Sequence, residues 1–224
     1  MGRLPSMATK RSYGDRCGVA RALDVVGERW ALLVVRELLL GPKRFTDLRA
    51  GLPNLSPDVL SQRLRELEQA GLLRRRKLAP PASARVYELT ERGLALEPVV
   101  LELGRWGSQA PFPADDAAFG ADSFVLALKT LFDPAAAAGL ELTVELRLGE
   151  DRFRSRVAGG RLEAARGSAD TPDAVVSSDP GTLAAVLWHG RPLAEALRTG
   201  DVEIDGSTPA VKRFLGAFPA PVAA

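Results

Sequence analysis

The chain has almost none of the residues that build common covalent and metal features. It contains 224 residues but only one cysteine, Cys17, and one histidine, His189. A single cysteine excludes an internal disulfide and any multi-cysteine zinc site. A single histidine removes the usual metal-ligand clusters and most histidine-based catalysis. We therefore expect no metal, no cofactor and no enzyme of the common hydrolase or metalloenzyme designs.

Long apolar runs are also missing. No run approaches the roughly 20 residues that a membrane-spanning helix needs, and the longest, residues 31–40, is interrupted by Arg36 and Glu37. The first fifteen residues contain basic side chains but no apolar core, so no secretory signal is expected. Apolar content of 46% and charged content of 26% are ordinary for globular proteins. These features predict a cytoplasmic protein that has no membrane partner.

Charge is divided unequally along the chain. Residues 1–110 carry 19 lysines and arginines against 12 acidic residues, whereas residues 111–224 carry 11 against 16. The first part is therefore basic by seven charges and the second acidic by five. Such a division indicates that one half meets a polyanion and the other does not.

The first half has the periodicity of several short helices. Apolar spacing and glycine stops predict helices over 17–26, 30–40, 45–50 and 56–70. Ser56 supplies a capping oxygen, and Pro57 suits the first helical position. In this fourth helix a buried stripe of leucines, Leu60, Leu64 and Leu67, opposes a polar face. That face carries Asp58, Ser61, Gln62, Arg65 and Gln69, residue types that include readers of base edges in a major groove.

A basic hairpin is predicted after this helix. Residues 72–78 form an arginine-rich strand, residues 79–84 a loop with two prolines, and residues 85–89 a returning strand. One last helix is expected over 91–106, with Leu94, Leu101 and Leu103 available for packing. A helix-turn-helix followed by a basic hairpin is typical of a winged helix that binds DNA.

Residues 17–106 resemble HxlR-type winged helix-turn-helix transcriptional regulators, relatives of the MarR group. The resemblance rests on the segment that begins at Cys17, on Gly27-Glu28-Arg29-Trp30, on the segment from Arg44 to Leu48, on the helix from Ser56 to Gly71, and on the segment from Arg85 to Thr90. It implies a homodimer formed through the first and last helices, with the Ser56 helix in double-stranded DNA. It also implies a response to electrophiles, oxidants or metabolites.

The protein is expected to bind a pseudo-palindromic operator, and its DNA-binding candidates fall into two groups. Ser61, Gln62 and Arg65 are predicted base readers. The other candidates lie beside phosphates or the minor groove: Arg44, Ser56, Pro57 and Arg85. Cys17 is a candidate redox sensor, because it lies close to a helix N-terminus beside Arg16. The alternative for Cys17 is a small apolar residue that packs at the dimer interface.

The second half reads as a small α+β domain. A helix over 121–132 precedes strands over 140–148, 152–157, 161–166 and 174–177. The first of these strands alternates polar and apolar residues, which predicts a half-buried antiparallel strand. Helices over 179–189 and 192–197, a short strand or turn over 200–204 and a helix over 209–218 complete it. The whole chain is thus predicted as α+β, with a winged helix-turn-helix N-terminal domain and a small sterol-carrier-like domain after it.

The stretch from Asp173 to Leu215 resembles the sterol carrier protein type 2 domain, through its pattern of glycines and apolar positions. The resemblance implies an effector site for a small apolar molecule. The candidate pocket residues are Leu183, Leu187, Trp188, Leu197, Phe214 and Phe218. The alternative is a packed core without a pocket. We predict four segments: a flexible extension over 1–14, a DNA-binding domain over 15–106, a linker over 107–120 and a ligand domain over 121–220.

Three functions are compatible with these patterns. The first is a dimeric, sequence-specific DNA-binding transcriptional regulator that responds to a small apolar ligand or to redox state. The second is a lipid- or metabolite-binding carrier whose winged helix serves dimerisation or protein contact. The third is an enzyme in the second half. The charge division and the polar face of the Ser56 helix favour the regulator, and the lack of acid–base pairs weighs against the enzyme.

Overall fold

The computed structural model describes residues 12–79, 84–110 and 119–220. The expectations for the first eleven residues, for the hairpin tip over 80–83 and for the linker over 111–118 lie outside this part of the chain. In the described residues no helix is both long and apolar enough to cross a membrane.

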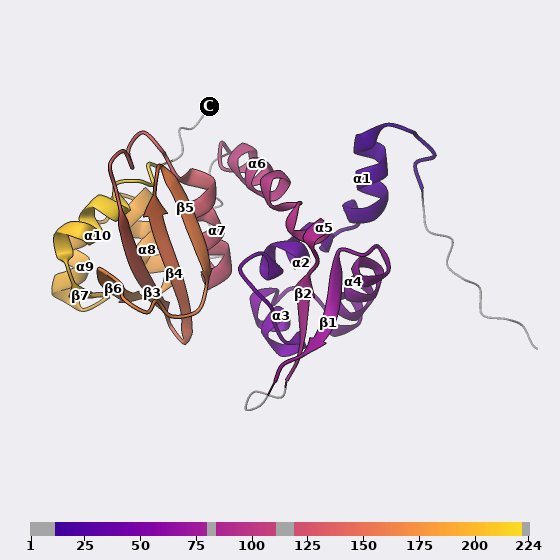
Figure 1. Ribbon diagram of the computed structural model, residues 1–224, viewed down its shortest axis with the longest axis horizontal. Helices are drawn as coiled ribbons and strands as arrows, with labels where there is room; N and C mark the ends of the chain where they lie inside the picture. The colour runs from indigo at the N-terminus through magenta and orange to yellow at the C-terminus, as the bar shows by residue number, and fades with distance from the viewer. Residues whose placement is uncertain (1–11, 80–83, 111–118, 221–224) are drawn as a thin grey trace, which may run out of the picture.

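The chain packs around two hydrophobic cores. One core is built from buried side chains between Val26 and Leu89, and the other from side chains between Phe124 and Phe218, with Leu40 added. We call the part up to residue 110 the N-terminal unit and the part from residue 119 the C-terminal unit. Figure 1 shows the two units side by side, with the wing of the N-terminal unit pointing away from both cores.

The N-terminal unit contains the predicted helices and hairpin. Its elements are α1 (Gly18–Val26), α2 (Ala31–Leu38), α3 (Phe45–Gly51), α4 (Pro57–Gln69), β1 (Leu73–Lys77), β2 (Arg85–Leu89), α5 (Glu91–Leu94) and α6 (Glu97–Gly107). Up to β2, every boundary lies within two residues of the predicted one. The hairpin pairs Leu73 with Leu89 and Lys77 with Arg85 in antiparallel register.

Local chemistry explains why α4 begins where it does. The Ser56 hydroxyl accepts a hydrogen bond from the Val59 backbone N–H at 3.4 Å, and Pro57 occupies the first turn. The cap satisfies one N–H of the first turn, which has no partner inside the helix. Leu60, Leu64 and Leu67 are fully buried, as predicted.

The last helix of this unit was predicted wrongly as one element. It is divided into α5 and α6, with Ala95 and Leu96 between them. Pro98 has no N–H and its ring disfavours a helical residue before it, so it fits the first turn of a new helix better than a helix interior. Leu94 and Leu103, which were expected to pack inside, are 48% and 49% exposed.

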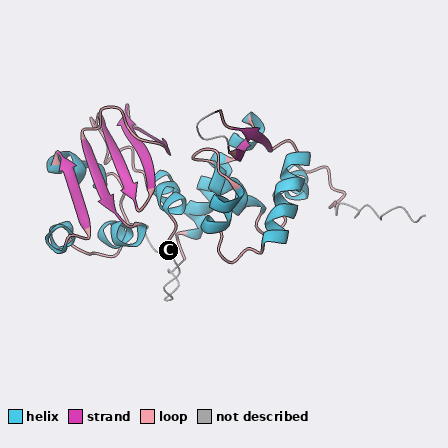
Figure 2. Ribbon diagram, turned by 90° about the horizontal axis from the view of Figure 1, so that it is seen from below, coloured by secondary structure: helices cyan, strands magenta, loops and turns pink. Residues whose placement is uncertain are grey.

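The C-terminal unit is a five-stranded sheet with helices, which confirms the α+β prediction. Its elements are α7 (Ala121–Leu131), β3 (Leu142–Leu148), β4 (Asp151–Ala158), β5 (Arg161–Arg166), β6 (Ala174–Ser178), α8 (Pro180–Trp188), α9 (Leu193–Thr199), β7 (Val202–Gly206) and α10 (Thr208–Leu215). The strand order is β5-β4-β3-β6-β7. Figure 2 shows the helices gathered on one face of this sheet. On the other face, β4 exposes Arg152, Arg154 and Arg156.

The central strand differs from its prediction in two respects. β3 begins at Leu142 and pairs antiparallel with β4 but parallel with β6. Its polar face is also covered, because the carboxylate of Glu145 is buried and accepts hydrogen bonds from Arg147 Nε at 2.7 Å and from the Ala169 N–H at 2.9 Å. The segment that connects β5 to β6 therefore packs over this strand. Alternation shows which side chains share a face but not which strand is the partner.

Candidate nucleic-acid interface

The outer face of α4 presents the predicted base readers. Gln62 and Arg65 are exposed and Ser61 is half-buried. The amide nitrogen of Gln62 donates a hydrogen bond to Glu66 Oε1 at 3.0 Å, so this reader has a partner within its own helix. Arg65 has no ion pair in the described part of the chain, which leaves its guanidinium available to a ligand.

Arg63 holds α4 against the rest of the unit, a role that the sequence analysis missed. It is 8% exposed, and its Nη1 lies 2.5 Å from Glu66 Oε2 and 3.7 Å from Glu28 Oε2. Glu28 lies in the turn between α1 and α2. The spacing of Arg63 and Glu66 is the signal that was available, since residues three apart are neighbours on a helix.

Three wing arginines are already paired with carboxylates. Arg74 Nε and Arg76 Nε each lie 2.7 Å from a carboxylate oxygen of Glu88, which is directly opposite Arg74 across the hairpin. Arg75 lies 3.1 Å from Glu68 of α4. The pair of Arg75 with Glu68 links the wing to α4, and the two pairs with Glu88 link β1 to β2. All three reduce the charge that the wing offers to phosphates.

The outer end of the wing carries the unpaired charges. Lys77 and Arg85 lie directly opposite each other across the hairpin, and both side chains are exposed. Neither forms an ion pair with a described residue. Like charges at directly opposite positions destabilise a hairpin, and an anion between them removes this repulsion. Lys77 was not among the predicted contacts, because the hairpin register is needed to place it beside Arg85.

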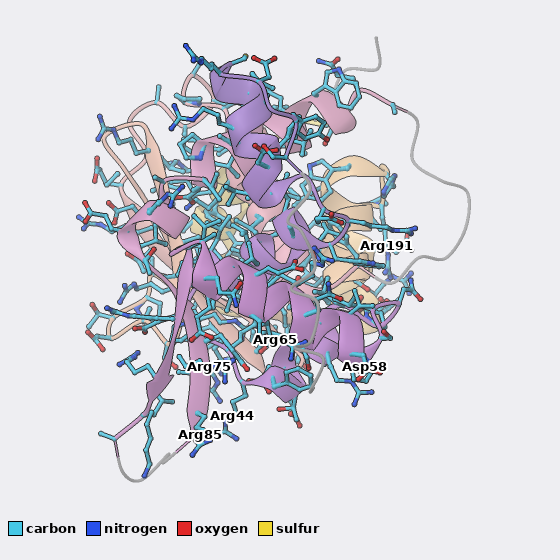
Figure 3. All side chains as sticks on the ribbon, turned by 90° about the vertical axis from the view of Figure 1, so that its right-hand side faces the viewer. Arg44, Asp58, Arg65, Arg75, Arg85 and Arg191 are labelled. Carbon is cyan, nitrogen blue, oxygen red and sulfur yellow. The ribbon has the colours of Figure 1, made fainter. Side chains whose placement is uncertain are left out.

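Side chains from three elements gather on one side of the N-terminal unit (Figure 3). Arg44, which immediately precedes α3, lies near the wing arginines Arg75 and Arg85, with Arg65 of α4 above them. Arg191, between α8 and α9, lies apart from this group. Ser56 and Pro57 are exposed at the start of α4. The structure thus brings the starts of α3 and α4 and the wing to one surface.

Two other helix faces of the N-terminal unit, on α6 and on α1, are apolar and uncovered. On α6, Val99, Leu103 and Trp106 share one face and are 53%, 49% and 72% exposed. On α1, Val19 and Leu23 share a face and are 67% and 42% exposed. Apolar stripes on two helices at this exposure are typical of a surface that meets a protein partner.

Cys17 occupies the N-cap position of α1, where its thiol is exposed and makes no capping hydrogen bond. The nearby backbone N–H groups of Val19 and Ala20 lower the pKa of the Cys17 thiol. This arrangement favours the thiolate, which is the form that reacts with oxidants and electrophiles.

The predicted pocket residues lie in or beside the core of the C-terminal unit. Leu183, Phe214 and Phe218 are fully buried, whereas Leu187, Trp188 and Leu197 are half-buried at its margin. The rings of Trp188 and Phe124 lie 5.7 Å apart. Trp188 Nε1 is shielded from solvent and has no hydrogen-bond acceptor in the described residues.

The structure also has a hollow of about 380 Å³ in the N-terminal unit. It is lined by Thr46, Arg49, Ala50, Pro53 and Leu55. It lies on α3 and the turn before α4, among none of the predicted pocket residues. Across the described residues, no group of three or more histidine, cysteine, aspartate or glutamate side chains is placed to hold a metal ion.

The helices α3 and α4, the polar outer face of α4 and the basic hairpin of β1 and β2 define a winged helix-turn-helix DNA-binding protein. Comparison with known proteins agrees with this class. The family model described as HxlR-like helix-turn-helix matches residues 25–113. The uncharacterised HTH-type transcriptional regulator YvaP of Bacillus subtilis is 42% identical over 90 residues, which cover 40% of this chain and 82% of YvaP. The chain belongs to the HxlR-like helix-turn-helix family, and it is a DNA-binding transcriptional regulator.

Relatives of known structure match the same part of the chain. The HTH-type transcriptional regulator YodB of Bacillus subtilis is 37% identical over 94 residues, which cover 42% of this chain and 84% of YodB. Its reduced form aligns with 45% of this chain and 100% of its own, at 35% identity and a TM-score of 0.39. The redox regulator HypR in its oxidised form aligns with 43% of this chain and 100% of its own, at 35% identity and a TM-score of 0.39.

The C-terminal unit matches a different family model from the one expected. The model described as alkyl sulfatase C-terminal covers residues 118–223. The expected likeness to the sterol carrier protein type 2 domain is not confirmed by this match. The two family models together match residues 25–113 and 118–223, and the alignments with YvaP and YodB each cover less than half of this chain.

Proposed function

We propose that the protein is a homodimeric regulator that binds a pseudo-palindromic operator. In this arrangement residues 15–106 form the DNA-binding domain, residues 107–120 a linker and residues 121–220 an effector domain. The apolar faces of α1 and α6 form the dimer interface, and the two α4 helices enter successive major grooves about one helical turn apart. The observation that carries the DNA contact is at the end of the wing. There Lys77 and Arg85 lie opposite each other, and neither has a carboxylate partner among the described residues.

The contacts divide into two classes. Ser61, Gln62 and Arg65 read base edges from α4, because they lie on its outward face. The phosphate or minor-groove contacts come from Arg44, Ser56, Pro57, Lys77 and Arg85. Base contacts set sequence preference, whereas phosphate contacts set the salt dependence of binding.

Two substitutions and a matched control test this assignment. Arg85→Ala should weaken binding to every duplex and lower the slope of log K against log salt by about 2 for a dimer. Arg65→Ala should cost about 1–3 kcal/mol on the operator and relax specificity. Arg156→Ala removes the same charge from the far sheet and should leave binding unchanged. The operator is first selected from random duplexes. If Arg85→Ala and Arg65→Ala both bind as the control does, the interface is misassigned.

We further propose that the C-terminal unit is a sterol-carrier-like effector domain, not an enzyme, and that it binds a small apolar molecule. Helix α8 carries no charged residue, and it leaves Leu187 and Trp188 only half-buried. The unpartnered Trp188 Nε1 is available to donate a hydrogen bond to one polar group of such a ligand. Thermal melting of the full chain with fatty acids, sterols and aromatic metabolites tests the site. Absence of any shift, or an equal shift in Leu187→Ser, would count against it.

Redox responsiveness is the second regulatory proposal. It is supported by the exposed thiol of Cys17 at the N-terminus of α1, whose pKa is lowered, and by similarity to other regulators. These include YodB, solved in quinone-bound and diamide-treated forms, and the redox regulator HypR. Diamide or a quinone should change operator affinity in the wild type and leave it unchanged in Cys17→Ser. Equal responses in both would remove Cys17 as the sensor.

A further inference from the structure

A buried ion-pair cluster joins the two units at Lys43. The Lys43 side chain is 4% exposed, and its Nζ lies 2.6 Å from Glu37 Oε2 and 2.6 Å from Asp122 Oδ2. Glu37 belongs to α2 and Asp122 to α7, and both are buried. One ammonium group is therefore held by a carboxylate from each unit, where little water screens the interaction.

Both carboxylates have a second cation within their own unit. Glu37 Oε1 accepts from Arg36 Nη2 at 2.8 Å, and Asp122 Oδ1 accepts from Arg166 Nε at 2.9 Å. Loss of the link between the units therefore leaves neither carboxylate buried without a cation. Removing one partner of a buried pair is most destabilising when it leaves an uncompensated charge, and that condition is not met here.

The backbone of Lys43 is also hydrogen-bonded to strand β2 of the wing. The Lys43 N–H donates to the Tyr87 carbonyl at 3.0 Å, and the Tyr87 N–H donates to the Lys43 carbonyl at 2.8 Å. Tyr87 lies in β2 two residues after Arg85, and Arg44 directly follows Lys43. Any displacement of Lys43 is therefore transmitted to both proposed phosphate contacts.

The surroundings leave the cluster little freedom. Leu40, three residues before Lys43, is buried in the core of the C-terminal unit, and its carbonyl accepts from the Arg166 N–H at 3.0 Å. On the other side, Gly51 at the end of α3 packs closely against the Glu37 carboxylate. There is no room for a side chain between them, because a Cβ atom at Gly51 would lie 2.2 Å from Glu37 Oε2. The segment from α2 to Lys43 is thus clamped between α3 and the sheet.

We propose that Lys43 is a positioning residue through which the C-terminal unit holds the wing in its DNA-binding position. This inference rests on the proposed phosphate contacts of Arg44 and Arg85. The Lys43 ammonium is buried against two carboxylates, so it acts on DNA through the wing and not by touching phosphate. A change at α7 that shifts Asp122 also shifts Lys43 and the wing strand hydrogen-bonded to it. The C-terminal unit can thereby change the affinity for the operator.

Asp122→Asn is the main test, because it removes one carboxylate charge at nearly constant volume. It should weaken binding to a random-sequence duplex at fixed salt by about 3- to 10-fold. The slope of log K against log salt should stay at the wild-type value, since no phosphate contact is lost. The matched control is Asp151→Asn, which removes a carboxylate 2.6 Å from Arg166 Nη1 without touching Lys43. It should bind as the wild type does.

A second variant separates positioning from general loss of structure. Lys43→Met should give the same loss as Asp122→Asn, and the double variant should give no more than either, because both break the same Lys43–Asp122 link between the units. Amide exchange at the Tyr87 N–H should be faster in both single variants. All affinities are measured at a temperature where melting curves show every variant folded.

The outcomes discriminate between this inference and the function on which it rests. Equal affinities of Asp122→Asn and Asp151→Asn, additive losses in the double variant, or a reduced salt slope in Asp122→Asn would each overturn the role of Lys43. A wild-type chain that shows no salt-dependent binding to duplex DNA would instead overturn the proposed DNA interface.

Discussion

Replacement of Trp106 by serine should disrupt the proposed homodimer. Trp106 is 72% exposed at the end of the apolar face of α6. A tryptophan presents about 200 Å², so about 150 Å² is available for burial here. At about 25 cal/mol per Å², burial of half of this area contributes about 2 kcal/mol per protomer. A two-fold interface contains the residue twice, so Trp106→Ser should raise the dimer dissociation constant about 1000-fold.

Sedimentation velocity over a concentration series measures this constant directly. Glu102→Gln is the matched control, because it alters an exposed neighbour on the same helix without removing apolar area. Operator affinity of Trp106→Ser should fall with the dimer population, while the variant stays folded at the temperature of the measurement. An unchanged dissociation constant in a folded Trp106→Ser variant would refute α6 as the interface, and so would a wild-type chain that stays monomeric throughout the series.

Two stability predictions follow from single contacts. Burial opposes ionisation of Asp179, but hydrogen bonds donated by the first turn of α8 outweigh it and lower the pKa of this carboxyl. Asp179→Ala should therefore cost about 1 kcal/mol at pH 7, and urea titrations should show the cost shrinking as the pH falls below about 4, where the carboxyl protonates. Gly93→Ala should cost about 1–3 kcal/mol, because its Cβ would lie 2.0 Å from the Leu72 carbonyl oxygen. Gly104→Ala, which meets only the Thr130 side chain at 3.3 Å, should cost less; equal costs would contradict the packing argument.

Features set by neighbours in the sequence were predicted well. The Ser56 cap, the proline after it and the leucine stripe of α4 depend on residues within one or two helical turns, and they fix α4 without reference to the rest of the chain. The hairpin was also predicted to within one residue at each end, because a basic strand and an alternating strand are separated by a proline-containing loop.

Features set by distant neighbours were not predictable. The parallel pairing of β3 with β6 and the burial of Glu145 depend on how the segment after β5 crosses the sheet. Pro98 is a local signal for the division between α5 and α6. The apolar periodicity continues across Pro98, however, and it predicted a single helix. The cluster around Lys43 joins residues 79 positions apart, and no local pattern marks such a pair.

The ion pairs in the structure change what the charge division means for DNA binding. The basic excess of seven in the first half predicts a salt slope of about −13 for a dimer if every excess charge displaces a counterion. This excess already subtracts the carboxylates of residues 1–110, so it does not identify which cations are unpaired. In the structure, Lys43, Arg63, Arg74 and Arg76 are held by carboxylates. The unpaired cations proposed to contact phosphates are Arg44, Lys77 and Arg85. A dimer therefore has six such cations.

Six phosphate contacts predict a slope of about −5. The slope is measured by fluorescence anisotropy of a labelled random duplex between low and moderate salt, with Arg156→Ala as a control that should not change it. A slope steeper than about −10 would show that cations assigned here to internal pairs, or others on the surface, contact the backbone. A slope near −5 that falls on loss of Lys77 or Arg85 would instead show that the wing and the start of α3 carry the electrostatic part of binding.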